Sequence, residues 1–66
     1  MLRNLDAEQA RHAMTNEDVA KVLEVSRVTY ESKKKTGKFT LSEIKLLCRL
    51  FSCGFDYLFE TKEEQN

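Results

Sequence analysis

Four side chains between positions 27 and 32 have the chemistry needed to recognise a patterned polar surface. Arg27 carries a planar fork of N–H donors, Glu31 carries a carboxylate that accepts, and the hydroxyl of Ser32 does both. Val28 adds an apolar contact among them. Base edges in the major groove of DNA present donors, acceptors and a methyl group in distinct patterns, so this mixture of side chains suits base recognition.

Side chains for catalysis or metal binding are sparse. Cys48, Cys53 and His12 do not have the spacing of a zinc finger or ribbon, and a fourth ligand is missing. The chain has no Gly-rich phosphate loop, no assembled Ser-His-Asp or Cys-His set and no carboxylate pair in an obvious cleft. We therefore expect no enzyme, no metal, no cofactor and no small-molecule substrate. The cysteines are interpreted as small, reduced core residues, and His12 as a helix-end residue near the carbonyl pole.

The four side chains belong to the second of two short helical patterns, which are joined by a tight corner at residues 24 and 25. Thr15 is the predicted N-cap of the first helix, and Asp18 three residues later is the acid of a capping box. A narrow apolar stripe follows at Val19, Ala20 and Leu23.

The second helix is predicted from Arg27 to about Lys34, with Ser26 as its N-cap. Only Tyr30 faces firmly inward, so this helix buries little and presents its other side chains. Two short helices at a steep angle, the second with a mixed polar face, indicate a helix-turn-helix over about residues 15–35.

Further helices are predicted on both sides of this pair. Residues 1–13 form one, with Asn4 as its cap and inward contacts from Leu2, Leu5 and Ala10. Thr40 and Glu43 form a capping box that opens a helix running to about Ser52. The predicted apolar face of that helix consists of Leu41, Ile44, Leu47, Cys48 and Phe51, widened by Leu46 and Leu50.

The C-terminal part of the chain begins at Gly54, which ends the preceding helix or loosens the start of the last one. A short apolar turn and a half then carries Phe55, Leu58 and Phe59. Residues 61–66 are polar and are predicted to form a tail, so the domain is expected to span residues 1–60.

Composition supports a small all-α domain. The chain has 66 residues, 41% of them apolar, with no proline and two glycines. It contains no run of about 18 apolar residues and no signal-peptide pattern, from which we expect a soluble cytoplasmic protein without a membrane partner.

Charge is distributed unevenly although the net charge is zero. Residues 1–24 carry three basic and five acidic side chains, residues 25–49 carry seven and two, and residues 50–66 carry one and four. The local balances are −2, +5 and −3, so the positive charge coincides with the presented helix and the segment after it. A basic segment in this place favours a nucleic-acid partner.

The order and spacing of these features resemble the helix-turn-helix signature of the phage Cro and repressor family, the xenobiotic-response-element type. The resemblance covers about residues 4–60 and is carried by Asn16, Val19-Ala20, Leu23, Val25-Ser26-Arg27, Tyr30, Gly37-Lys38 and the segment 55–59. It implies a compact five-helix, all-α fold of DNA-binding transcriptional regulators that usually bind as dimers.

The chain departs from the family pattern at several positions, among them Cys53, where relatives carry a branched aliphatic residue, and Gly54, where they often have a Ser cap. Glu24 stands at a corner where relatives generally have Gly or Asn, because the backbone there tends toward the left-handed region; Glu would tolerate it at a cost of about 1 kcal/mol. Ala13 replaces a common Gly in a similar turn. Lys34 and Gln9 occupy the places of an internal salt bridge in relatives, so that bridge is not expected here.

A specific DNA-binding mode follows from this interpretation. The helix from Arg27 would enter the major groove of double-stranded DNA, with Arg27 on guanine O6 and N7, Val28 on a thymine methyl, Glu31 on cytosine N4 and Ser32 on several possible base edges. Phosphate contacts are expected from Asn16, Thr29, Lys34, Lys35 and Lys38.

One such module reads only a half-site, so we expect a homodimer, at least on DNA, and an inverted-repeat operator. The predicted dimer surface is the exposed part of Phe51, Phe55, Tyr57, Leu58 and Phe59, although these aromatics could instead close the core of a monomer. A second hypothesis is a protein-binding adaptor, antirepressor or antitoxin-like, that keeps the fold and uses the Phe-rich end for its partner. Zero net charge and the acidic tail favour it mildly.

Overall fold

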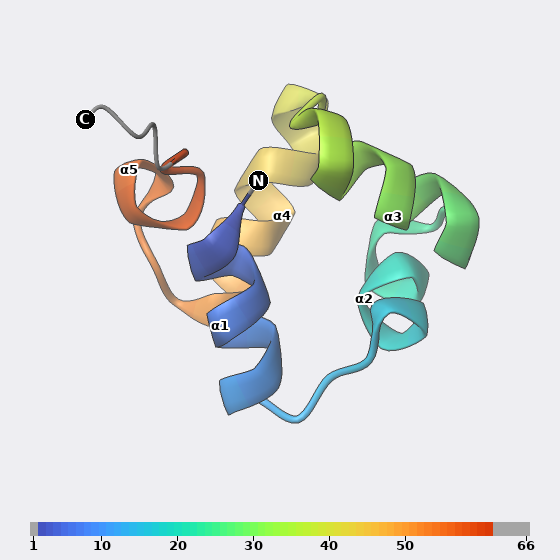
Figure 1. Cartoon of the computed structure of the whole chain (residues 1–66), viewed down its shortest axis with the longest axis horizontal. Helices are drawn as coiled ribbons and strands as arrows, with labels where there is room; N and C mark the ends of the chain where they lie inside the picture. The colour runs from blue at the N-terminus through green and yellow to red at the C-terminus, as the bar shows by residue number, and fades with distance from the viewer. Residues whose placement is uncertain (1, 62–66) are drawn as a thin grey trace.

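Residues 2–61 are described by a computed structural model, and within them the chain forms five α-helices and no strand (Figure 1). The helices are α1 (Arg3–Arg11), α2 (Asn16–Leu23), α3 (Arg27–Thr36), α4 (Leu41–Phe51) and α5 (Phe55–Leu58). The all-α prediction is confirmed. Met1 and most of the expected tail, residues 62–66, lie outside the described residues.

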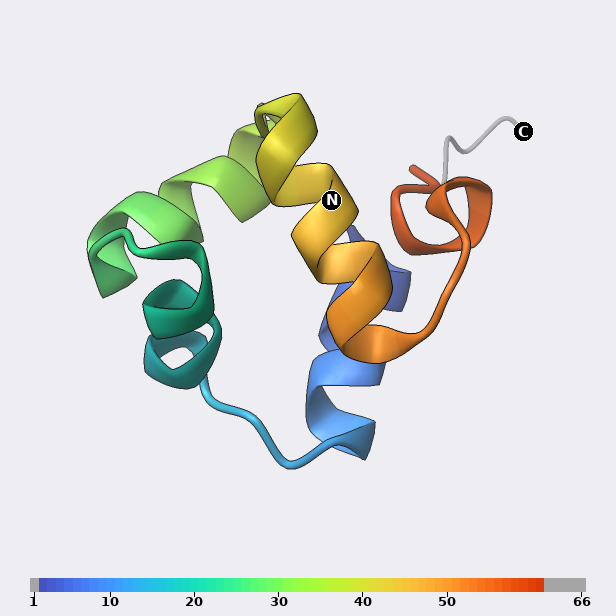
Figure 2. The same ribbon diagram turned by 180° about the vertical axis from the view of Figure 1, so that it is seen from behind.

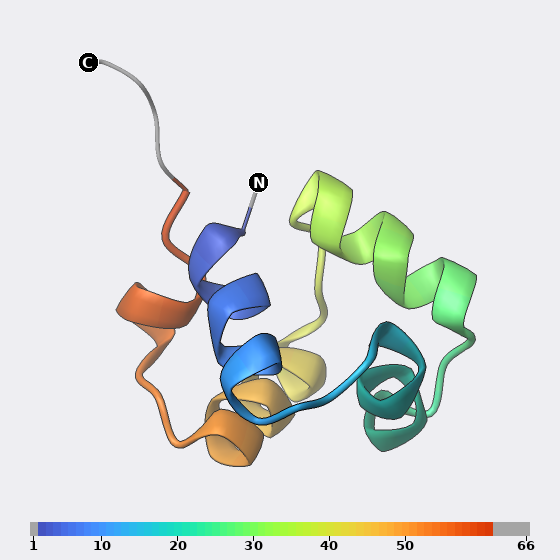
Figure 3. The ribbon, with the colours of Figure 1, turned by 60° about the horizontal axis from the view of Figure 1, so that its bottom comes forward.

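Helix α4 lies between the two ends of the molecule. Helices α2 and α3 form one end, and α1 and α5 form the other (Figures 1 and 2). Packing follows this arrangement, since α2 contacts both α3 and α4, whereas α5 contacts both α1 and α4. Figure 3 shows α3 beside α2 and far from α5. The inner side of α3 also contacts α1, because Lys34 pairs with Asp6 and Tyr30 donates to Gln9. The opposite side of α3, with Val28, Ser32 and Lys35, is exposed.

The helix starts follow the local signals in the sequence. The hydroxyls of Thr15, Ser26 and Thr40 accept hydrogen bonds from backbone N–H groups three residues later, at 3.1, 3.1 and 3.2 Å. Asp18 and Glu43 complete two capping boxes by accepting from the backbone N–H of the cap residue. These three predicted caps are confirmed, and each satisfies N–H groups that have no partner inside the helix.

Within residues 2–61, three non-glycine residues have left-handed backbone conformations close to helix ends. Their φ angles are 55° at Ala13, 61° at Glu24 and 54° at Ser52. Gly37 closes α3 with a φ of 76°, which a glycine adopts without strain. The expected left-handed corner at Glu24 is thus present, and it orients α3 relative to α2.

The core is a single cluster to which every helix contributes. Its buried apolar residues are Leu2, Leu5, Val19, Ala20, Leu23, Tyr30, Leu47, Phe51 and Leu58. The predicted stripe of α2 and the inward position of Tyr30 are confirmed. No helix within residues 2–61 is long and apolar enough to cross a membrane.

Several predictions about α1 and α4 are wrong. Ala10 is exposed, and the inner side of α1 instead buries the polar residues Glu8 and Gln9. Asn4 does not cap the helix; it lies inside α1, and its amide donates to the carbonyl oxygen of Tyr57 over 2.8 Å. Leu41 is 69% exposed, because the first turn of α4 extends past the core and faces α5 across open space.

Candidate nucleic-acid interface

The uncovered side of α3 displays most of the predicted base-contacting residues. Val28 is 65% exposed, and Ser32 and Lys35 are exposed as well. Together with Glu31 they line a shallow hollow of about 230 Å³ on the helix surface. Val28 therefore makes no contribution to the core, in contrast to Tyr30 two residues later, which is fully buried.

Glu31 is the common acceptor for two of the other predicted contact residues. Its Oε2 accepts from Nη1 of Arg27 and from the amide of Asn16, each over 2.9 Å. These hydrogen bonds, that from Asn16 first and that from Arg27 second, lower the pKa of the Glu31 carboxyl below its ordinary value of 4.5. Glu31 is therefore ionised at neutral pH and holds the leading end of α3 to the start of α2.

The hydrogen bonds continue from Asn16 into the molecule. Gln9 of α1 donates to Oδ1 of Asn16 over 2.8 Å, and its own Oε1 accepts from the hydroxyl of Tyr30 over 2.9 Å. Burial, with a smaller contribution from the negative charge of Asp6, raises the pKa of Tyr30, so its hydroxyl keeps its proton and remains a donor. A polar chain thus connects α1, α2 and α3 behind the exposed face.

Lys34 belongs to this internal chain. Its Nζ lies 2.6 Å from Oδ1 of Asp6 and 3.4 Å from Oε1 of Gln9, and 5.2 Å from the centre of the Tyr30 ring. The Lys34 side chain is only 16% exposed. Lys34 thus pairs with Asp6 of α1, and its other α1 contact, Gln9, is uncharged.

The other predicted phosphate-contacting residues differ in whether their side chains already have a partner within the protein. Lys35 and Lys38 are exposed, and neither has an ion pair with any residue in the range 2–61. The hydroxyl of Thr29 accepts from Oγ of Ser26 over 2.9 Å at the start of α3. Lys33, two positions before Lys35, forms an ion pair in which its Nζ lies 3.3 Å from Oε1 of Glu43.

Some residues of the predicted dimer surface are buried in the core, and others are exposed. Phe51 and Leu58 are 2% and 0% exposed and belong to the core, and Phe59 is half-buried. Phe55 is 53% exposed and Tyr57 is 39% exposed. Only the last two offer appreciable area to a second molecule.

Gln9 and Asp6 lie behind the candidate interface, and their contacts with α3 were not predicted from the sequence. A signal was present for Gln9 alone, because a tyrosine in a core needs a hydrogen-bond partner for its hydroxyl. A polar residue on the inner side of α1 was the available partner, and Gln9 fills that role. The prediction from the sequence assigned the inner side of this helix to Ala10 instead.

A second buried polar group ties α1 to α5. Glu8 accepts from the hydroxyl of Tyr57 over 3.0 Å, and Nε of Arg11 lies 3.5 Å from the same carboxylate oxygen. The hydrogen bond to Glu8, together with burial, raises the pKa of Tyr57. His12 Nδ1 lies 2.9 Å from the Glu8 carbonyl oxygen, so its predicted place at the carbonyl end of the helix is confirmed.

The two cysteines are half-buried and unbridged. Within residues 2–61, no group of three or more His, Cys, Asp or Glu side chains comes together as a metal site. Burial, together with the nearby Glu8 carboxylate, raises the pKa of the Cys53 thiol. That environment does not favour the thiolate, the reactive form of cysteine.

The chain matches no protein-family model, and it has no significant match among curated proteins or solved structures.

Proposed function

We propose that this protein is a sequence-specific regulator that binds double-stranded DNA and acts in the cytoplasm, with α2 and α3 as a helix-turn-helix. One observation carries the proposal: Asn16 of α2 and Arg27 of α3 converge on Glu31, at the leading end of an exposed helix face. Lys35 and Lys38 border that face, and neither has an ion pair within residues 2–61. A helix held in this way keeps its side chains in a defined register, which base recognition requires.

In this proposal α3 enters the major groove with Arg27 first. The guanidinium uses the N–H groups that do not face Glu31 to reach guanine O6 and N7. Val28 packs on a thymine methyl, and Ser32 contacts a base edge one turn further along. Oε2 of Glu31 is already an acceptor for two protein donors, so its Oε1 is the atom proposed to accept from cytosine N4.

Phosphate contacts set the position of the helix on the duplex. We assign Lys35 and Lys38 to the strongest of these, because both ammonium groups are exposed and unpaired within residues 2–61. Thr29 and the start of α2 at Asn16 complete the set. Lys34 reaches a phosphate only by leaving Asp6, so we assign it a weaker contact.

Self-association completes the proposed binding unit, since one α3 reads one half-site. Phe55 and Tyr57 are the exposed aromatic residues of α5, and we propose that they meet their equivalents in a two-fold symmetric pair. The operator is then an inverted repeat whose half-sites lie about one helical turn apart.

Selection from random duplex DNA tests the proposal directly. Purified protein in about 100 mM salt should enrich an inverted repeat. Arg27→Ala should relax the preference at one base pair by about 1–3 kcal/mol and leave the others unchanged. If no sequence is enriched and affinity for bulk DNA is weak at low salt as well, the protein is not a DNA-binding regulator.

A further inference from the structure

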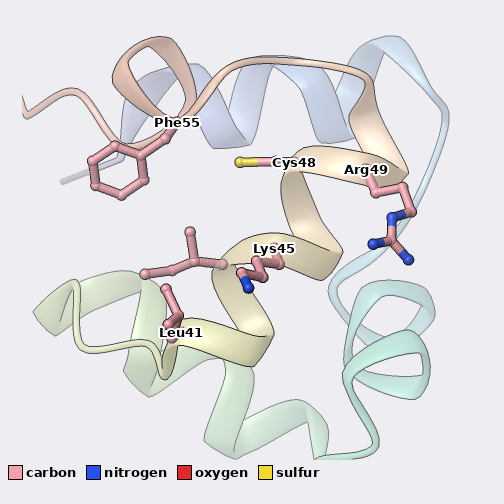
Figure 4. Close-up of a pocket in the computed structure, with 6 residues that line it drawn as sticks. Leu41, Lys45, Cys48, Arg49 and Phe55 are labelled. Carbon is pink, nitrogen blue, oxygen red and sulfur yellow. The ribbon is translucent and has the colours of Figure 1, made fainter.

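A groove of about 700 Å³ runs between α4 and α5, on a different surface from the exposed face of α3 (Figure 4). Its lining consists of Leu41, Ile44, Lys45, Cys48, Arg49 and Phe55. The α4 members recur at helical spacing and form one side, and Phe55 forms the other. Leu41 and Phe55 are 69% and 53% exposed, so apolar area in the groove is open to solvent.

The Phe55 wall is held in place by a row of aromatic rings. Phe55 stacks on Phe59 with ring centres 5.3 Å apart, and Phe59 meets Phe39 edge-on at 5.6 Å. Phe39 in turn lies 6.2 Å from the ring of the fully buried Tyr30. Because the wall is anchored to the core, a ligand in the groove would not have to order it first.

Charge determines which ligand the groove suits. Lys45 and Arg49 stand one helical turn apart on α4, and neither pairs with an acidic residue in the range 2–61. No carboxylate lines the groove. In Figure 4, Arg49 extends from the side of α4 away from Phe55, so positive charge flanks the apolar floor.

A second copy of the chain is a poor occupant for the space between α4 and α5. If two copies filled each other's grooves about a two-fold axis, Lys45 and Arg49 of both molecules would come together. Like charges brought together in this way oppose association. The self-association proposed above is a different contact, because it uses Phe55 and Tyr57 of α5 and not the α4 side of the groove.

We propose that the groove binds an acidic amphipathic helix of another protein, with apolar side chains on one face flanked by Asp and Glu. The apolar side chains fill the space between α4 and Phe55, and the carboxylates pair with Lys45 and Arg49. Such a partner leaves the α3 hollow uncovered, because the two sets of lining residues share no member. It covers Phe55, however, and therefore competes with self-association through α5.

The test uses two synthetic peptides of about 18 residues, long enough for a stable amphipathic helix in the bound state. Both carry Leu at i, i+3, i+4 and i+7, one with Glu and the other with Lys at the flanking positions. Each is titrated into isotopically labelled full-length protein and followed by NMR chemical shifts. The Glu peptide should bind about tenfold tighter than the Lys peptide and shift signals of Leu41, Ile44 and Phe55.

A charge-reversed variant separates the role of the groove from general electrostatics. Lys45→Glu combined with Arg49→Glu should reverse the preference and favour the Lys peptide. The matched control, Lys35→Glu with Lys38→Glu, makes the same change in net charge outside the groove and should leave the preference for the Glu peptide. Both pairs lie at exposed positions, and circular dichroism checks that each variant is folded.

Three results would overturn the proposal. The two peptides could bind equally, or the shifted signals could map away from α4 and α5. Alternatively, Leu41 signals could shift on concentrating the protein without peptide, which would make a second copy the occupant. None of these measurements involves DNA, so failure here and failure of the proposed DNA binding are distinguishable.

Discussion

The amide of Asn16 donates to Oε2 of Glu31 over 2.9 Å, although the two residues are fifteen positions apart and belong to different helices. Arg27 donates to the same oxygen from within α3. One carboxylate therefore sets the position of a proposed phosphate-contacting residue and of a proposed base-contacting residue. This gives Glu31 a positioning role that its type and place in the sequence did not indicate.

Removing the carboxylate should affect a base pair that Glu31 does not touch. Glu31→Ala frees the guanidinium of Arg27, so discrimination at the base pair read by Arg27 should fall, by less than the roughly 1–3 kcal/mol expected for Arg27→Ala. Binding assays on a panel of single-base operator variants measure the change. Ser32→Ala is the control, since Ser32 has no bond to Arg27 and should change only its own base pair. An unaltered preference at the Arg27 position after Glu31→Ala would contradict the positioning role.

Lys35 should contribute affinity without sequence preference. Lys35→Ala removes an exposed ammonium group that lines the α3 hollow and has no ion pair among residues 2–61, so every duplex should bind more weakly by a similar factor. The slope of log affinity against log salt should become shallower by about 0.9. Lys45→Ala loses the same charge from α4 and should leave the slope unchanged. If Lys35→Ala and the parent protein gave equal slopes of log affinity against log salt, Lys35 would not contact a phosphate.

Replacing Glu24 at the corner between α2 and α3 with glycine should stabilise the folded protein. Its φ of 61° costs a residue with a β-carbon about 1 kcal/mol, and Glu24→Gly should raise the free energy of unfolding by an amount of that order. Urea unfolding followed by circular dichroism measures it. Glu17→Gly, at another exposed position but in the first turn of α2, should instead destabilise by up to about 1 kcal/mol. If both substitutions destabilise, the corner is not strained.

Stability should decrease in acid through the carboxylates of Asp18, Glu31 and Glu43. The pKa of Asp18 is lowered by the backbone and side chain of Thr15, and that of Glu31 by Asn16 and Arg27. Burial opposes the shift at Glu43, but Thr40 and Lys33 together lower its pKa. Folded-state pKa values below the unfolded ones mean that the unfolded chain binds more protons in this range. The stabilisation is therefore complete well above the ordinary values of 3.8 and 4.5 and is lost as the pH falls through the folded-state values.

Thermal unfolding measured at a series of pH values between 7 and 3 tests this dependence. The midpoint temperature of unfolding should decrease once the pH is below about 4.5. Glu31→Gln should show a smaller decrease than the parent protein, because one of the three groups no longer titrates. Glu17→Gln removes an exposed carboxylate of α2 that accepts no hydrogen bond from a cap residue within residues 2–61, and it is not expected to change the profile. A flat profile in the parent protein would mean that these carboxylates do not stabilise the fold.

Much of the fold was determined by the sequence through local signals. Thr15, Ser26 and Thr40 each place a side-chain acceptor three residues before a free N–H group, and that geometry depends only on the neighbouring backbone. The apolar spacing of α2 and the glycine at position 37 act over the same short range. Helix number, most helix starts and the presented face of α3 were predictable for this reason.

The tertiary structure alone decided which side chains those helices bring together. Whether Gln9 or Ala10 faces inward depends on how α1 sits against α3, and the chain of hydrogen bonds from Tyr30 to Glu31 exists only because three helices meet there. Likewise, the spacing of Leu41 along α4 predicts burial, yet no neighbouring helix among residues 2–61 reaches far enough to cover it. Spacing along a helix specifies a face, whereas burial and pairing depend on the position of elements distant in the sequence.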